Sequence, residues 1–281
     1  MTHRNLRALG LHGFHRMAYT EWGRVASPAL VCVHGLTRTG RDFDPLARAL
    51  EARFRIVCPD LPGRGGSEWL PHPEDYGLPL YLSSLAALLA RLDVEEVDWV
   101  GTSLGGILGL TLAAQPGSPI RRLVLNDVGP VIPRAAAERI AGYVGENPRF
   151  ATLEELEVYL RRVHASFGPL TDDQWRHLAT SGSRRDADGA WRLHYDPAIG
   201  LAFRLLPPTD TAFWPLWDAI RCPVLVLRGA DSDLLLPSTL DEMRRRGPPV
   251  EFVEFPGVGH APALLSEDQI SVVADWLLRR A

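Results

Sequence analysis

Two kinds of hydrophobic pattern alternate along the first 130 residues of the chain. Short continuous apolar runs, ALVCVHG, FRIVCPD, VDWVG and IRRLVLNDVGP, are typical of strands that are buried on both faces of a sheet. Between them lie DPLARALEAR, YLSSLAALLARL and a segment from Gly105 onward, in which apolar residues recur with the period of a helix. This order of elements predicts an α/β fold, with a mostly parallel sheet that is flanked by helices.

The strand pattern stops after residue 131 and resumes near residue 214. The intervening segment has helical signals in AAAERIAGYVG, LEELEVYLRRVHASFG and TDDQWRHLAT, and then the irregular stretch WRLHYDPAIGLAF. Two further strand runs, CPVLVLRGA and VEFVEFPGVGH, precede a closing helix, SVVADWLLRR. We therefore expect residues 1–131 and 214–281 to form one core, and residues 132–213 to form an inserted helical cap.

The stretch EEVDWVGTSLGGILGLTLAAQ, residues 95–115, places a serine between glycines where a strand pattern changes into a helical one. Such a serine belongs either to an ordinary tight turn or to a strained elbow that holds a nucleophile outward. The G-x-S-x-G motif is common by chance, but the strand before it and the helix after it favour the second interpretation. Ser103 is therefore the candidate nucleophile.

A glycine-rich loop after the last apolar strand, GVGHAP, carries the candidate base, His260. An imidazole presented by such a loop can accept the proton of the serine and later return it to the leaving group. Together with the early pair His34-Gly35, the turn DLPGRGGS and the late SDLL, these motifs resemble the α/β-hydrolase superfamily over almost the whole chain. The resemblance implies a triad in the chain order serine, acid, histidine.

The acid has three candidates. Asp231 and Asp233 both follow the strand PVLVL, and either carboxylate could orient the imidazole. The setting RGADSDLL resembles a family variant in which the aspartate directly after a serine is the triad member, which favours Asp233. Asp127, in LVLNDVGP, is the least favoured candidate; it is considered because some relatives place the acid after the preceding core strand. The pattern instead favours a role of Asp127 in shaping the turn into the insertion. The expected triad is Ser103, Asp233 and His260.

Backbone N–H groups are the expected donors to the negative charge that develops on the substrate oxygen. The resemblance implies Leu104, which follows the nucleophile, and Leu36, in the loop after the early His-Gly pair. Arg38 in this loop could contact a substrate carboxylate, although an arginine at a solvated helix start is commoner. Trp214 and Tyr195 are further possible substrate-binding residues, with core packing as their ordinary alternative.

Composition narrows the range of partners. A net charge of -4 and a pI near 6.1 leave no basic field for nucleic acid, and the absence of lysine excludes Schiff-base chemistry on that side chain. The three cysteines lie in or beside apolar strands, and no segment has the length of a membrane span or the pattern of a secretion signal. The turn DLPGRGGS lacks the lysine and the spacing of a phosphate-binding loop. We expect a cytoplasmic protein without cofactor or metal, and the oligomeric state stays open.

The expected function is hydrolysis of small or medium carboxylic esters by an acyl-enzyme route, with a small-molecule ester as the partner. Enzymes with the same core cleave carbon-carbon bonds of ring-fission products, open enol-lactones or transfer acyl groups, and these reactions stay as alternatives. A non-enzymatic ligand receptor on a hydrolase-like core is the alternative from another class. Haloalkane dehalogenases and epoxide hydrolases are disfavoured, because they resemble this chain but carry aspartate where Ser103 stands.

Overall fold

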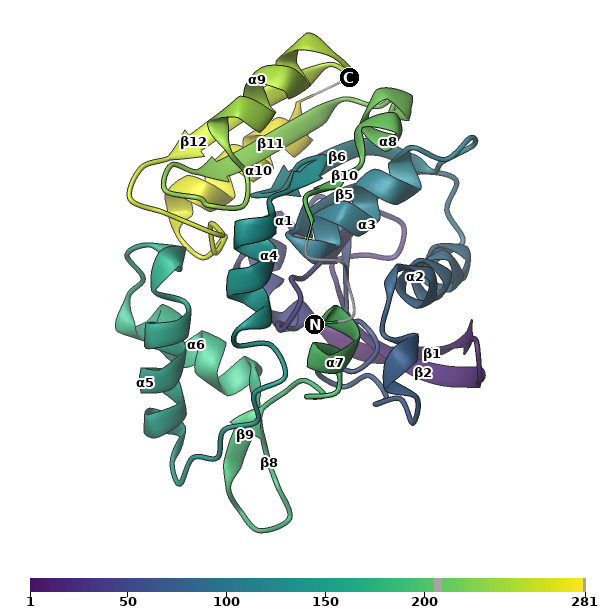
Figure 1. The fold of residues 1–281 in the computed structure, drawn as a ribbon. Coiled ribbons are helices and arrows are strands. Elements are labelled where there is room, and N and C mark those ends of the chain that lie inside the picture. Colours follow the sequence, from purple (N-terminus) through teal and green to yellow (C-terminus); the bar gives the residue numbers. More distant parts are fainter. Residues whose placement is uncertain (205–208, 280–281) are drawn as a thin grey trace.

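An eight-stranded sheet runs through the middle of the molecule in the computed structural model, which describes residues 1–204 and 209–279 (Figure 1). The order of its strands is β1-β2-β4-β3-β5-β6-β11-β12, and every neighbouring pair from β4 to β12 is parallel. The expected mostly parallel sheet is therefore confirmed. Its strands are β1 (Thr2–Gly10), β2 (Gly13–Trp22), β3 (Ala29–Val33), β4 (Arg55–Pro59), β5 (Val97–Thr102), β6 (Ile120–Asn126), β11 (Val224–Gly229) and β12 (Val250–Phe255).

The first two strands are the part of the sheet that the hydrophobic pattern does not predict. β1 pairs antiparallel with β2, and β2 pairs antiparallel with β4. β1 lies at the edge of the sheet, and only Leu6 and Ala8 of its side chains are buried. An edge strand of this kind lacks the continuous apolar run that marks the central strands.

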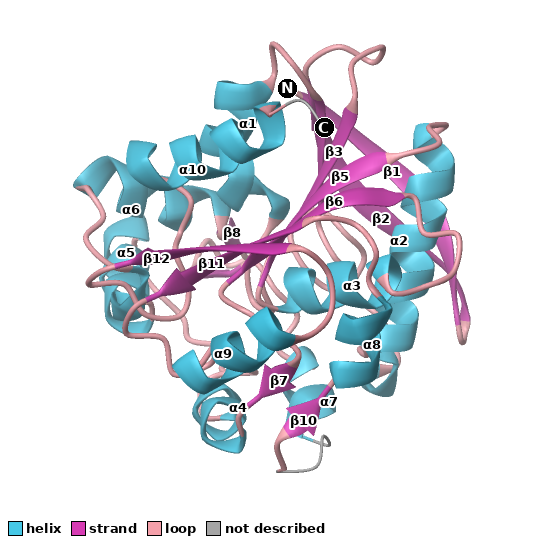
Figure 2. Ribbon diagram, turned by 90° about the horizontal axis from the view of Figure 1, so that it is seen from above, coloured by secondary structure: helices cyan, strands magenta, loops and turns pink. Residues whose placement is uncertain are grey.

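Helices cover both faces of the sheet (Figure 2). The helices α1 (Asp44–Leu50) and α10 (Glu267–Leu278) share one apolar core with the sheet. On the opposite face lie α2 (Leu78–Leu92), α3 (Leu104–Ala113), α8 (Trp214–Ala219) and α9 (Pro237–Arg245), whose buried side chains form the second core. The helical patterns predicted around α1, α2, α3 and α10 are present, whereas α8 and α9 were not predicted.

The segment between β6 and α8 lies over one end of the sheet (Figure 1). It contains the helices α4 (Arg134–Ala141), α5 (Leu153–Val163), α6 (Asp172–Ser181) and α7 (Ile199–Arg204). Two short antiparallel pairs accompany them, β7 (Val131–Ile132) with β10 (Thr211–Ala212), and β8 (Ser183–Arg185) with β9 (Trp191–Leu193). Among the described residues, none from 132–213 joins the main sheet. The exact bounds of a separate cap stay a prediction.

The topology brings four distant loops to one edge of the sheet. β5, β6, β11 and β12 are neighbours or near neighbours and run parallel, so the loops after their carboxyl ends meet there. Ser103 follows β5, Asp127 follows β6, Ser232 follows β11, and His260 follows β12. Within residues 1–204 and 209–279 no helix combines the length and the apolar character that crossing a membrane requires.

Candidate active site

Ser103 lies on a sharp elbow between β5 and α3. Its backbone has φ 52° and ψ -114°, a conformation that non-glycine residues rarely adopt. The elbow depends on the glycines two positions before and after the serine. A Cβ at Gly101 would lie 2.3 Å from the oxygen of Gly105, and a Cβ at Gly105 would lie 2.0 Å from the oxygen of Val33. Only glycine therefore lets the strand, the elbow and the helix approach this closely.

His260 joins the serine to a buried carboxylate. The hydroxyl of Ser103 donates to Nε2 of His260 at 3.0 Å, and the Nδ1–H of His260 donates to Oδ2 of Asp127 at 2.7 Å. The second hydrogen bond fixes the tautomer, because a carboxylate accepts and thus holds the proton on Nδ1. Nε2 is then free to accept the serine proton. An arrangement of this kind can activate a hydroxyl for attack on a carbonyl carbon.

Asp127 is held in place by the residues that follow β11. Its side chain is fully buried, its Oδ1 accepts the N–H of Gly229 at 2.8 Å, and its Oδ2 accepts the hydroxyl of Ser232 at 2.6 Å. The backbone of Asp127 has φ 54°, in the left-handed region that aspartate tolerates better than most residues. With His260, three donors therefore satisfy a carboxylate that has no access to water.

The expectation that Asp233 orients the imidazole is wrong for this structure, because Asp127 makes that contact. Asp233 lies 47% exposed and accepts two hydrogen bonds from Arg139 of α4, at 2.5 and 2.8 Å. Burial works against its charge, but the Arg139 guanidinium holds the pKa of Asp233 below its ordinary value. Asp231 is exposed as well. From the SDLL motif it is Ser232 that reaches the triad, by its bond to Asp127.

The expected oxyanion loop lies beside the nucleophile. A Cβ at Gly35 would be 3.7 Å from the Cβ of Ser103. His34 fixes this loop from the buried side: its Nε2 accepts the N–H of Leu61 at 2.9 Å, and its Nδ1–H donates to the oxygen of Gly35 at 2.7 Å. Burial lowers the pKa of His34 to about 3, so the ring stays neutral. His34 thus supports the loop and forms no hydrogen bond of its own with the triad among the described residues.

The two predicted oxyanion donors have no competing partner. In the described ranges, neither the N–H of Leu36 nor that of Leu104 donates a hydrogen bond within the protein. Leu104 is also the first residue of α3, where backbone N–H groups carry the partial positive charge of the helix dipole. Both amides are thus available to an anionic oxygen near Ser103, and their role stays a prediction.

A small cavity of about 30 Å³ adjoins the triad. Its walls include Gly35 and Thr102 of the core, Ala261 next to the triad histidine, and Phe167 and Leu178 of the segment between β6 and α8. This volume holds little more than one water molecule. A substrate that used this space would therefore have to displace side chains of the overlying segment.

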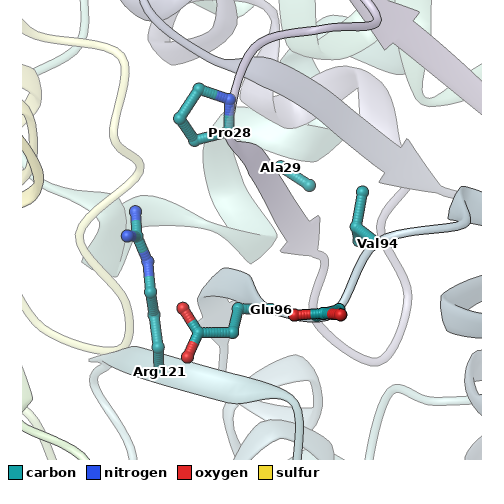
Figure 3. Close-up of a pocket in the computed structure, with 6 residues that line it drawn as sticks. Pro28, Ala29, Val94, Glu96 and Arg121 are labelled. Atoms are coloured by element: carbon teal, nitrogen blue, oxygen red, sulfur yellow. The ribbon is translucent and has the colours of Figure 1, made fainter.

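A larger cavity of about 400 Å³ lies elsewhere and does not belong to this site (Figure 3). Its lining includes Ala29, Glu96 and Arg121, which stand at or beside the amino ends of β3, β5 and β6. Ser103 and Asp127 follow the carboxyl ends of the same strands, so the cavity is at the opposite edge of the sheet. No group of three or more potential metal ligands is found in the part of the chain that the structure describes.

The three predicted substrate-binding residues have different surroundings. Arg38 lines the small cavity, but its guanidinium is already bound to both carboxylate oxygens of Asp42, at 2.7 and 2.8 Å. Tyr195 is buried, and its hydroxyl donates to the backbone oxygen of Glu146 at 3.0 Å. Trp214 lies under the guanidinium of Arg246, 5.0 Å from the ring centre. A substrate contact by any of the three stays a prediction.

Comparison with known proteins agrees with this geometry. The model of the alpha/beta hydrolase family matches residues 30–276. The 3-hydroxybutyrate-oligomer hydrolase of Cupriavidus necator is 51% identical over 273 residues, which cover 94% of this chain and 93% of that protein. The 2-(acetamidomethylene)succinate hydrolase of Mesorhizobium japonicum is 27% identical over 237 residues, with coverage of 84% and 82%. A putative hydrolase from Rickettsia typhi superposes with a TM-score of 0.94 at 28% identity, with 100% of both chains covered. The chain therefore belongs to the α/β-hydrolase family.

Proposed function

We propose that this α/β-hydrolase is a serine ester hydrolase that cleaves short oligomeric esters of 3-hydroxybutyrate. The observation that carries the proposal is the continuous hydrogen-bonded chain from Ser103 through His260 to the buried carboxylate of Asp127. The substrate class is suggested by the 51% identity with a 3-hydroxybutyrate-oligomer hydrolase over nearly the full length of both proteins.

In the first half of the reaction the Ser103 oxygen attacks the ester carbonyl while Nε2 of His260 takes the hydroxyl proton. Asp127 stabilises the imidazolium that forms, because it already accepts the Nδ1–H at 2.7 Å. The amides of Leu36 and Leu104 donate to the tetrahedral oxyanion. When the intermediate collapses, Nε2 returns its proton to the leaving alcohol oxygen, and the acyl group stays on Ser103.

In the second half a water molecule replaces the leaving alcohol. His260 removes one proton from this water as it attacks the acyl carbonyl, and the same two amides donate to the second oxyanion. Collapse breaks the bond to the Ser103 oxygen, which regains its proton from Nε2. The linear dimer of 3-hydroxybutyrate thus releases one unit as the leaving alcohol in the first half and the other as the free acid in the second, and no cofactor is needed for either.

The test combines covalent labelling with turnover. We expect a fluorophosphonate to label the peptide that contains Ser103, and the protein to release 3-hydroxybutyrate from its dimer and trimer. Ser103→Ala should lose both properties by several orders of magnitude and keep its fold, because the change removes one oxygen and opens no large cavity. An adduct on another peptide, or turnover retained by the folded variant, would overturn the proposal.

The other reactions of this fold define the comparison substrates. The relative that is named a 2-(acetamidomethylene)succinate hydrolase is similar over most of both chains, so its substrate belongs in the panel beside enol-lactones and simple alkyl esters. A preference for one of those compounds would move the assignment to that class. Failure of the intact triad to turn over any of them would favour the ligand receptor. A small-molecule ester as the partner, without nucleic acid, and a cytoplasmic location are parts of the proposal.

A further inference from the structure

One segment between β6 and α8 is attached directly to the loop that carries the triad histidine. The N–H of Gly259 donates to the backbone oxygen of Ser166 at 2.7 Å, and the hydroxyl of Ser166 donates to the backbone oxygen of His260 at 2.7 Å. A Cβ at Gly259 would lie 3.0 Å from the Cβ of Ser166. The end of α5 and the short 3-10 helix η3 (Ala165–Phe167) therefore lie on this loop.

The same segment presents an imidazole that the proposed reaction does not use. His164, directly after α5, stacks on Phe167 with ring centres 4.6 Å apart and planes 20° apart. Phe167 lines the small cavity beside the triad, and Arg38, Asp42 and His260 are the charged or titratable groups that act on His164. In the described part of the chain, the ring nitrogens of His164 have no hydrogen-bond partner.

The surroundings keep this ring neutral. Burial, reinforced by the positive charge of Arg38, lowers the pKa of His164 to about 3. A neutral imidazole offers one N–H donor and one acceptor nitrogen. A hydroxyl can use either of them, because it both donates and accepts. A carboxylate only accepts, so it could use the N–H but not the acceptor nitrogen. The guanidinium of Arg38, which would attract a carboxylate to this place, is already bound to Asp42.

We propose that His164 is a specificity-determining residue that hydrogen-bonds the 3-hydroxyl group of the substrate's acyl unit. The inference rests on the proposed function, since it assigns a partner to one group of that substrate. The ring stacks on Phe167, which lines the cavity beside the triad, and its nitrogens have no protein partner among the described residues. Two residues further on, Ser166 bonds the same segment to the loop that holds His260. Such a side chain discriminates a hydroxylated acyl group from the same group without the hydroxyl.

The test compares two esters that differ by this hydroxyl alone, methyl 3-hydroxybutyrate and methyl butyrate. The wild-type protein should favour the first in kcat/KM, and His164→Phe should reduce that preference about tenfold, the amount typical of one hydrogen bond lost in a substrate site. Phenylalanine keeps the stacking on Phe167, so turnover of methyl butyrate should change little. His164→Gln, which keeps a donor and an acceptor, should restore part of the preference.

A second histidine of the same segment gives the matched control. His177 in α6 already donates its Nε2–H to the backbone oxygen of Arg41 at 2.9 Å, so His177→Phe should affect both esters equally. The rate of fluorophosphonate labelling at Ser103 shows that each variant retains its active site. If His164→Phe fails to fold, the glutamine variant and the wild type still give the comparison.

The outcomes separate this inference from the proposed function. If the wild type prefers the hydroxylated ester and folded His164→Phe keeps the full preference, the role of His164 is refuted and the proposed function stands. An equal loss on both esters would show a purely structural role and also refute it. If His164→Phe lowers turnover of the 3-hydroxybutyrate dimer more than turnover of the methyl ester of that dimer, the partner of His164 is the substrate carboxylate, and the hydroxyl assignment is refuted. Absence of any hydroxyl preference in the wild type would also refute the role of His164, whereas only failure to hydrolyse the dimer and trimer would overturn the proposed function.

Discussion

Replacement of Asp127 by asparagine tests the arrangement of the triad most directly. The carboxylate of Asp127 accepts three hydrogen bonds, from His260, Gly229 and Ser232. An asparagine has nearly the same size but only one acceptor oxygen. If its NH2 group faces His260, Nδ1 must accept, and the ring proton moves to Nε2. The imidazole then can no longer take the proton of Ser103.

The expected loss of kcat has two causes, the missing negative charge of the carboxylate and the wrong tautomer of His260. The centres of the carboxylate and the imidazolium are about 4 Å apart, and at an effective dielectric constant near 20 their attraction is about 4 kcal/mol, or roughly 10³ in rate. The wrong tautomer adds to this loss. We therefore expect Asp127→Asn to lower kcat by about 10³- to 10⁴-fold, in the range that such a change produces in a serine triad.

Asp233→Asn is the matched control, because it makes the same chemical change on a neighbouring loop. The carboxylate of Asp233 is 47% exposed and bound to Arg139, so its removal should cost about 1 kcal/mol of stability or less and change turnover only a few-fold. Ester hydrolysis would be followed by titration of the released acid, with circular dichroism on each variant. A folded Asp233→Asn without turnover, beside a folded Asp127→Asn with near-normal turnover, would refute the reasoning.

Three further expectations concern stability and the segment above the site. Ser166→Ala removes a 2.7 Å bond to the carbonyl of the triad histidine, so we expect a several-fold fall in kcat at nearly unchanged stability, which steady-state kinetics and thermal unfolding would check. Burial lowers the pKa of His34 and of His164 to about 3, so each contributes stability that is present above pH 6.5 and is lost as the pH falls, by about 2 kcal/mol at pH 5. Burial raises the pKa of Asp60 to about 6, so protonation of this carboxyl below that pH stabilises the fold and offsets part of the loss. The free energy of unfolding, measured by urea titration, should therefore fall by about 2 to 3 kcal/mol from pH 7 to 5. A constant or rising value would contradict this sign. Residues 132–213 should exchange amide hydrogens faster than β3 and β5, and equal protection would argue against a separable cap.

The central sheet and the nucleophile could be predicted because their signals are local. β3, β4, β5 and β11 are largely apolar runs, and Gly101 and Gly105 are needed by backbone approaches among β5, α3 and the end of the neighbouring β3. The edge strand β1 could not be found in the same way, since the residues that face water along it are polar apart from Leu9, as in a loop.

The acid could not be chosen from the sequence, because Asp127 and Asp233, two of its three candidates, reach the same edge of the sheet. β6 and β11 are neighbours in the sheet, so Asp127 after one and Asp233 after the other arrive at the same edge. The choice depends on which side chain of the β11 loop points inward, and in the structure this is Ser232. The left-handed backbone of Asp127 and the N–H of Gly229 complete the arrangement, and neither leaves a hydrophobic pattern.

Contacts across long sequence distances also couple the segment between β6 and α8 to the position of the triad histidine. Ser166 and His260 are 94 positions apart, yet two hydrogen bonds connect the Ser166 backbone and hydroxyl to the loop of the histidine. If the segment moves to admit a substrate, these bonds must break or move with it, and the position of the imidazole changes as well. The residues that select the substrate and those that place the base are then parts of one unit. We therefore expect substitutions at Ser166 and Phe167 to change kcat and KM together, whereas substitutions at the outer surface of α5 should change neither.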